Sequence, residues 1–123
     1  MNSRSDWVLL ALHYAGPRGL TPAQLQKTLF LVQKNYPQAS KLAYDFQPYN
    51  YGPFDAAVYK DAENLMEDRL LHRRYRNGLN WGSYHISEAG SKRATKLASG
   101  KEKSHQYLAK AVAWAQSLSF QDL

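Results

Sequence analysis

The chain has 123 residues, the size of one ordinary domain with a single modest hydrophobic core. It contains no cysteine, which excludes a disulfide framework, a thiolate metal site and a thiol nucleophile, and its 13% of aromatic residues argues against extended disorder. The net charge of +6 is unevenly distributed along the chain. Residues 69–103 carry nine Lys or Arg and two Asp or Glu, whereas residues 1–68 carry six Lys or Arg and seven Asp or Glu.

Two helices are predicted in the N-terminal part of the chain. Over residues 6–15 apolar side chains recur on a wide helical face, and Gly16 is expected to end this helix. The second helix is predicted to begin after Thr21, which forms a Thr-x-x-Gln capping box with Gln24. It is expected to end near Tyr36.

An aromatic segment without clear periodicity follows the second helix. Its rings are Tyr44, Phe46, Tyr49, Tyr51 and Phe54. We predict a short strand over residues 41–46, a structural requirement for glycine at Gly52, and Pro53 in the first turn of the next helix. The polar side chains of Gln26 and Lys27 interrupt the apolar stripe of the second helix. They are either solvated or directed at the aromatic segment.

The third predicted helix, which follows Pro53, is acidic on its outer face. Between residues 55 and 68 it carries one lysine and five acids: Asp55, Asp61, Glu63, Glu67 and Asp68. Its apolar spacing turns most of these acids outward, where they would be repelled by DNA phosphates. The carboxylates are expected to share one solvated environment, so they do not predict a general acid and base.

Alternating residues on both sides of Asn77-Gly78 predict a hairpin, in which residues 73–75 pair with residues 83–86. His72 and His85 would face each other across it. Ser87 is expected to cap a fourth helix, and a last helix is predicted at about residues 104–118.

This order of elements is typical of a winged-helix-like fold: mostly α with a small two-stranded β wing. We expect a single domain over residues 1–123, with its core at residues 5–99. The last residues contain a Ser119-x-x-Asp122 pattern of the kind that begins helices. This pattern fits either a frayed tail or a longer natural protein that continues past Leu123, and we favour the longer protein.

Three motifs resemble a group of bacterial and phage proteins, the Panacea (SocA-like antitoxin) and YwgA-like proteins. They are LQKTLFLVQ at residues 25–33, FQPYNYGPFDAAVYKDAENL at residues 46–65 and YHISEAG at residues 84–90. The Leu-Gln-Lys helix and the Tyr-Gly-Pro segment, with a tyrosine in the helix that follows, carry most of the resemblance. It implies toxin neutralisation, or an adaptor or regulatory role, and supplies no catalytic residue.

The predicted function is that of a non-enzymatic antitoxin-like or adaptor domain that binds a partner protein, such as a toxin or a protease substrate. The residues expected to bind this partner are Tyr49, Asn50, Tyr51, Tyr59, Glu63 and Glu67. The alternative is a DNA-binding regulator, whose contacts would be Arg73, Arg74, Arg76, Lys92, Arg93 and Lys96. The four histidines show no spacing typical of a metal site. No cofactor, metal or membrane span is expected, the location is expected to be cytoplasmic, and the oligomeric state is left open.

Overall fold

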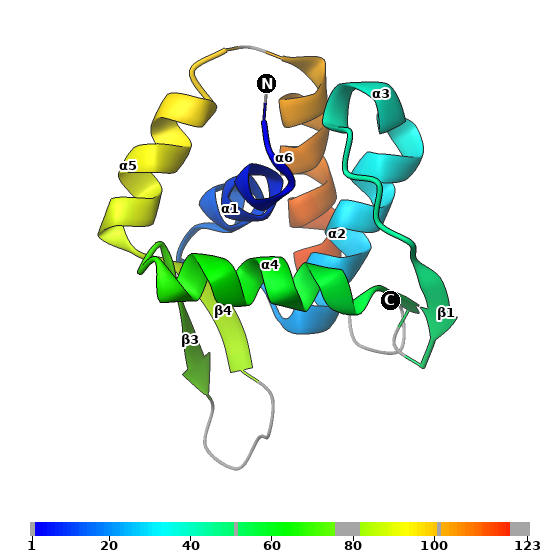
Figure 1. Cartoon of the computed structure of the whole chain (residues 1–123), viewed down its shortest axis with the longest axis horizontal. Coiled ribbons are helices and arrows are strands. Elements are labelled where there is room, and N and C mark those ends of the chain that lie inside the picture. Colours follow the sequence, from blue (N-terminus) through cyan, green and yellow to red (C-terminus); the bar gives the residue numbers. More distant parts are fainter. Residues whose placement is uncertain (1, 51, 76–81, 101, 119–123) are drawn as a thin grey trace.

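The computed structural model describes residues 2–50, 52–75, 82–100 and 102–118. These residues form a mostly helical structure with two small antiparallel sheets of two strands each (Figure 1). The elements, in chain order, are α1 (Arg4–Ala15), the 3-10 helix η1 (Gly16–Arg18), α2 (Pro22–Asn35), α3 (Pro37–Ser40), β1 (Gln47–Tyr49), β2 (Gly52–Phe54), α4 (Ala56–Glu67), β3 (Leu71–Tyr75), β4 (Gly82–Ile86), α5 (Glu88–Leu97) and α6 (Lys103–Gln116).

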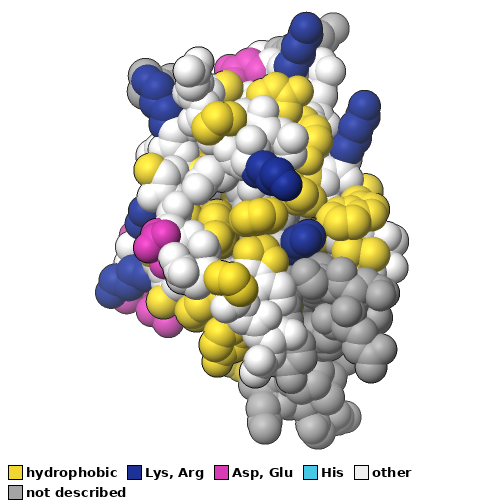
Figure 2. Space-filling model, turned by 90° about the vertical axis from the view of Figure 1, so that its right-hand side faces the viewer, with side chains coloured by type: hydrophobic (Ala, Val, Ile, Leu, Met, Phe, Trp, Pro, Cys, Tyr) yellow, Lys and Arg dark blue, Asp and Glu magenta, His cyan; other side chains and the backbone are white. Residues whose placement is uncertain are grey.

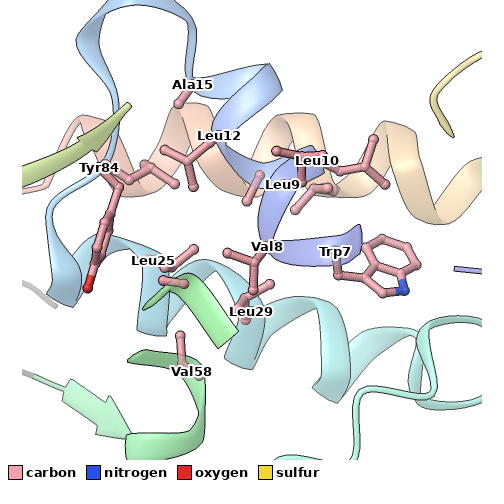
Figure 3. Close-up of a cluster of buried hydrophobic side chains, with 14 of the residues drawn as sticks. Trp7, Val8, Leu9, Leu10, Leu12, Ala15, Leu25, Leu29, Val58 and Tyr84 are labelled. Carbon is pink, nitrogen blue, oxygen red and sulfur yellow. The ribbon is translucent and has the colours of Figure 1, made fainter. Parts of the chain in front are cut away.

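Helix α1 is the centre of the hydrophobic core. Residues 7–12 are all buried, and the helix contacts α2, α4, α5 and α6, which surround it in Figure 1. Figure 3 shows its side chains among those of Leu25 and Leu29 from α2, Val58 from α4 and Tyr84 from β4. A helix that is apolar all round needs such complete cover.

Predicted helix starts at α2 and α5 are confirmed. The hydroxyl of Thr21 accepts a hydrogen bond from the backbone N–H of Gln24, whose side chain accepts one from the backbone N–H of Thr21. Ser87 caps α5 by accepting from the backbone N–H of Gly90. These bonds satisfy N–H groups that a helix start otherwise leaves without partners.

The predicted hairpin is confirmed as the antiparallel pair β3–β4, which we call the wing. Its register places His72 opposite His85, as expected, and Arg73 opposite Tyr84. An isolated antiparallel bridge joins Leu20 to Tyr84, which attaches the wing to the segment before α2. The Asn77-Gly78 turn itself lies outside the described residues.

A second hairpin, β1–β2, corrects two predictions. No strand forms over residues 41–46, because the pairing starts later, at Gln47. Pro53 is not in the first turn of a helix: it lies in β2 opposite Pro48, and α4 begins at Ala56. Asp55 sets that start, since its side chain accepts a hydrogen bond from the backbone N–H of Ala57.

The C-terminal helix α6 agrees with the predicted range, while the Ser119-x-x-Asp122 pattern lies outside the described residues. Across the described ranges, no helix is both long and apolar enough to cross a membrane.

Replacing Gly52 by valine tests the backbone of the β1–β2 hairpin. Gly52 has a φ of +106°, a conformation that a β-branched residue adopts only with strain. We expect Gly52→Val to lower the free energy of unfolding by roughly 1–3 kcal/mol, measured by urea denaturation. Gly100→Val is the control, because a Cβ at Gly100 meets nothing closer than 3.8 Å. Equal stability of the two variants would contradict the assignment.

Candidate functional site

A pocket of about 340 Å³ lies between the β1–β2 hairpin, the first turns of α2, and α4. We call it the aromatic pocket; its lining residues are Ala23, Gln26, Tyr49, Gly52, Pro53, Phe54 and Tyr59. Two of the residues predicted to bind a partner, Tyr49 and Tyr59, therefore come together here, although they belong to different elements.

Three rings form a connected row along this pocket. The ring centroids of Tyr49 and Phe54 are 5.1 Å apart, and those of Phe54 and Tyr59 are 5.4 Å apart. Tyr49 is 64% exposed, whereas Phe54 and Tyr59 are half-buried. Burial raises the pKa of the Tyr59 hydroxyl. The pocket thus offers flat apolar walls and one outer ring available for contact.

Gln26 fixes the base of this pocket. Its side chain is buried, and its amide pairs with both backbone groups of Asp55: Oε1 accepts from the N–H at 3.0 Å and Nε2 donates to the C=O at 3.0 Å. This confirms that Gln26 is directed at the aromatic segment. Lys27 is not: its Nζ lies over the rings of Phe30 and Trp114 instead.

Gln33, one heptad further along α2, makes the same contact at the other end of the segment. Its Oε1 accepts from the backbone N–H of Tyr44 and its Nε2 donates to the C=O of Tyr44, both at 2.8 Å. The backbone N–H of Asp45 also donates to the Asp55 carboxylate at 2.7 Å, which closes the segment on itself. Gln33 was not among the predicted site residues, although its spacing from Gln26 places the two side chains on one helix face.

Asp61 is not solvated as predicted. It is buried, its carboxylate accepts from Arg4 Nε at 2.7 Å, and the hydroxyl of Tyr44 donates to it. Desolvation and the hydrogen bond to this carboxylate raise the pKa of Tyr44 well above its usual range. Asp61 therefore joins α1, α4 and the aromatic segment, because a buried carboxylate requires such partners.

Of the other predicted acids, Glu63, Glu67 and Asp68 are exposed, whereas Asp55 is half-buried and caps α4. Glu63 and Glu67 follow Tyr59 at intervals of four residues, so the three side chains form a stripe that leads away from the aromatic pocket. We call this the acidic stripe. Asn50 is also exposed, directly after β1, while Tyr51 lies outside the described residues.

The basic residues of the wing do not form one cluster. Arg73 lies over the rings of Tyr84 and Tyr75, at 5.0 and 5.6 Å from their centroids. Arg74, the next residue along the strand, points to the opposite face, where it lines a second pocket of about 520 Å³ with His13 and His85. Arg76 lies outside the described residues.

The basic residues of α5 are partly engaged elsewhere. Arg93 forms an ion pair with Asp6 of α1 at 3.1 Å, and Lys92 lies 3.9 Å from Glu88 of its own helix. Lys96 is exposed. The described members of the set predicted to bind a polyanion thus point in several directions.

His85 is the most constrained histidine of the wing. Its ring stacks with that of His72, with centroids 5.8 Å apart, and its Nε2 lies 2.6 Å from the Ser83 hydroxyl. Burial, then the charge of Arg74, then His72 lower the pKa of His85. Among the side chains that the structure describes, no group of three or more could hold a metal ion.

Comparison with models of known protein families gave no match, and a search of curated proteins also gave none. The candidate site is therefore defined by its own geometry and chemistry.

The lowered pKa of His85 predicts a pH-dependent stability. The folded state binds a proton at His85 less readily than the unfolded chain does, so its stabilising contribution is complete above the ordinary histidine pKa of about 6.5 and is lost as the pH falls through the folded-state value. We expect His85→Gln to reduce this loss, measured by urea denaturation at a series of mildly acidic pH values. The control is His13→Gln, which replaces the half-buried histidine of α1 that lines the same pocket as His85. If the free energy of unfolding falls with pH by the same amount in His85→Gln and in the parent chain, the prediction is wrong.

Proposed function

We propose that this chain is a non-enzymatic, antitoxin-like or adaptor domain that binds a partner protein through the aromatic pocket and the acidic stripe. The observation that carries the proposal is the exposed ring of Tyr49, held over a pocket whose walls are Phe54 and Tyr59. Aromatic anchors in pockets dominate the energetics of protein interfaces. A toxin or a protease substrate is the kind of partner that the resemblance suggests.

The polar groups of the pocket favour a partner side chain over a small polar substrate. The amide oxygen and the amide nitrogen of Gln26 both already form hydrogen bonds with the backbone of Asp55. An enzyme site for a small molecule concentrates several convergent polar groups in one cavity, whereas this pocket presents mainly rings. An apolar or aromatic side chain of a partner would fill it.

The order of the elements supports a winged-helix-like arrangement as part of the proposal. Helix α1, the bridging residue Leu20, α2, α4 and the β3–β4 wing follow one another as they do in that fold, and the β1–β2 hairpin is an insertion before α4. In such a fold α4 is the helix that would approach a DNA groove. Its exposed face carries Glu63, Glu67 and Asp68, which favours a basic protein partner over DNA. A cytoplasmic location is part of the same proposal.

DNA binding through the wing remains the second candidate function. The observations in its favour are the net charge of +7 over residues 69–103 and the exposure of Arg74, Lys92 and Lys96. Against it stand the opposite directions of Arg73 and Arg74 and the ion pair of Arg93.

Removing the two tyrosines tests the proposed function. We expect the double variant Tyr49→Ala/Tyr59→Ala to lose partner capture, because each anchor ring contributes about 2 kcal/mol or more to such interfaces. Affinity capture from the native host followed by mass spectrometry measures it, with circular dichroism to verify the fold. Tyr75→Ala is the matched control, since Tyr75 is 61% exposed but lies on the wing. Capture of the same protein by the double variant and the parent in equal yield would refute the proposal.

A salt titration separates the second candidate. We expect duplex DNA to bind only weakly at low salt and without sequence preference, because the basic residues do not converge on one surface. Fluorescence anisotropy with an increasing salt concentration measures this. If the wing is instead a true DNA site, Arg74→Ala should reduce the slope of log affinity against log salt concentration by about one. Tight DNA binding by the parent chain together with this smaller slope in the variant would favour the DNA-binding regulator.

A further inference from the structure

A second exposed surface lies on the opposite side of α2 from the core, where α2 and α6 pack side by side. We call it the lysine–aromatic face. Its residues are Lys27, Phe30, Leu31 and Lys34 of α2 and Tyr107, Lys110 and Trp114 of α6. Within each helix they recur at intervals of three, four or seven residues, so each set forms one stripe.

Contacts between side chains join the two stripes into one surface. Nζ of Lys27 lies 5.6 Å from the ring centroid of Phe30 and 5.7 Å from that of Trp114. At the other end, Nδ2 of Asn35 donates to the Tyr107 hydroxyl at 2.8 Å. These contacts pair the end of one helix with the beginning of the other, which shows that α2 and α6 run antiparallel.

The charge of this face has one sign. Residues 22–35 and 103–116, which form the two helices, contain four lysines and no aspartate or glutamate. Figure 2 shows apolar side chains gathered in the middle of this side of the molecule, with Lys and Arg among them, and the acidic side chains mostly at its left edge. Trp114, at 46% exposure, is one of the few large apolar side chains left open to solvent among the described residues.

We propose that the lysine–aromatic face binds an acidic peptide segment that carries apolar side chains at helical spacing. Lysines on both stripes would pair with carboxylates, and the exposed parts of Phe30, Leu31 and Trp114 would receive the apolar side chains. The surface is separate from the aromatic pocket, and its charge is opposite to that of the acidic stripe. The proposal therefore does not depend on the proposed function and predicts a different partner segment.

Lys27 is the residue on which this face depends most. It is half-buried, and its ammonium group lies near two rings, so its charge is held in place between the two stripes. An incoming carboxylate would meet an oriented cation beside apolar surface, where water screens the pair less than at a fully exposed lysine.

The probe is a synthetic peptide with glutamates on one helical face and leucine and phenylalanine on the other. Titrating it into the isotope-labelled full chain should shift NMR signals of α2, α6 and the Trp114 indole. We expect Lys27→Gln to weaken binding about fivefold, because it removes one charge pair worth up to about 1 kcal/mol. Lys60→Gln, which removes an exposed lysine from α4, is the matched control and should bind like the parent.

Three further results decide the proposal. A peptide with lysine in place of each glutamate should not bind, and added salt should weaken binding of the acidic peptide. Trp114→Ala should also weaken it, with circular dichroism to verify the fold; if that variant does not fold, Lys27→Gln alone carries the test. Shifts that map to the wing, an equal loss in Lys60→Gln, or tighter binding of anionic lipid vesicles or single-stranded DNA at this face would overturn the proposal.

Discussion

Two glutamine side chains of α2 hold the part of the molecule on which the candidate site depends. Gln26 pairs with both backbone groups of Asp55 and Gln33 with both backbone groups of Tyr44, so the segment between them is attached at each end. A primary amide places an acceptor oxygen beside an N–H donor, so one side chain can pair with both backbone groups of a residue. Loss of either amide would leave backbone groups at one end of this segment without partners, which costs about 1–3 kcal/mol when they are buried.

This attachment explains how a short and proline-rich hairpin stays in place. The pair β1–β2 has only three residues in each strand and carries Pro48 opposite Pro53, so its own ladder has few hydrogen bonds. An isolated two-stranded hairpin is marginally stable in water. The amides of α2, the cap of α4 by Asp55 and the buried Asp61 supply the contacts that the ladder lacks.

The helices around α1 present surfaces of different charge. With α1 covered on all sides, each surrounding helix turns its polar face to solvent, and each of these faces has its own composition. Helix α4 presents acids, and the α2–α6 pair presents lysines among aromatic rings. Surfaces of opposite sign on one small domain would select different partner segments, since complementary charge guides encounter and excludes other partners.

The sequence by itself determined the features that depend on neighbouring residues. Periodicity and capping residues predicted α1, α2, α4, α5 and α6, and alternation predicted the pairing of β3 with β4, because these signals act over a few positions. The tertiary structure decided the rest. The β1–β2 hairpin is held mainly by side chains from α2, Asp61 is buried because Arg4 and Tyr44 reach it from distant parts of the chain, and Tyr49 meets Tyr59 only through that hairpin. Each of these depends on contacts between residues far apart in sequence, which no local pattern records.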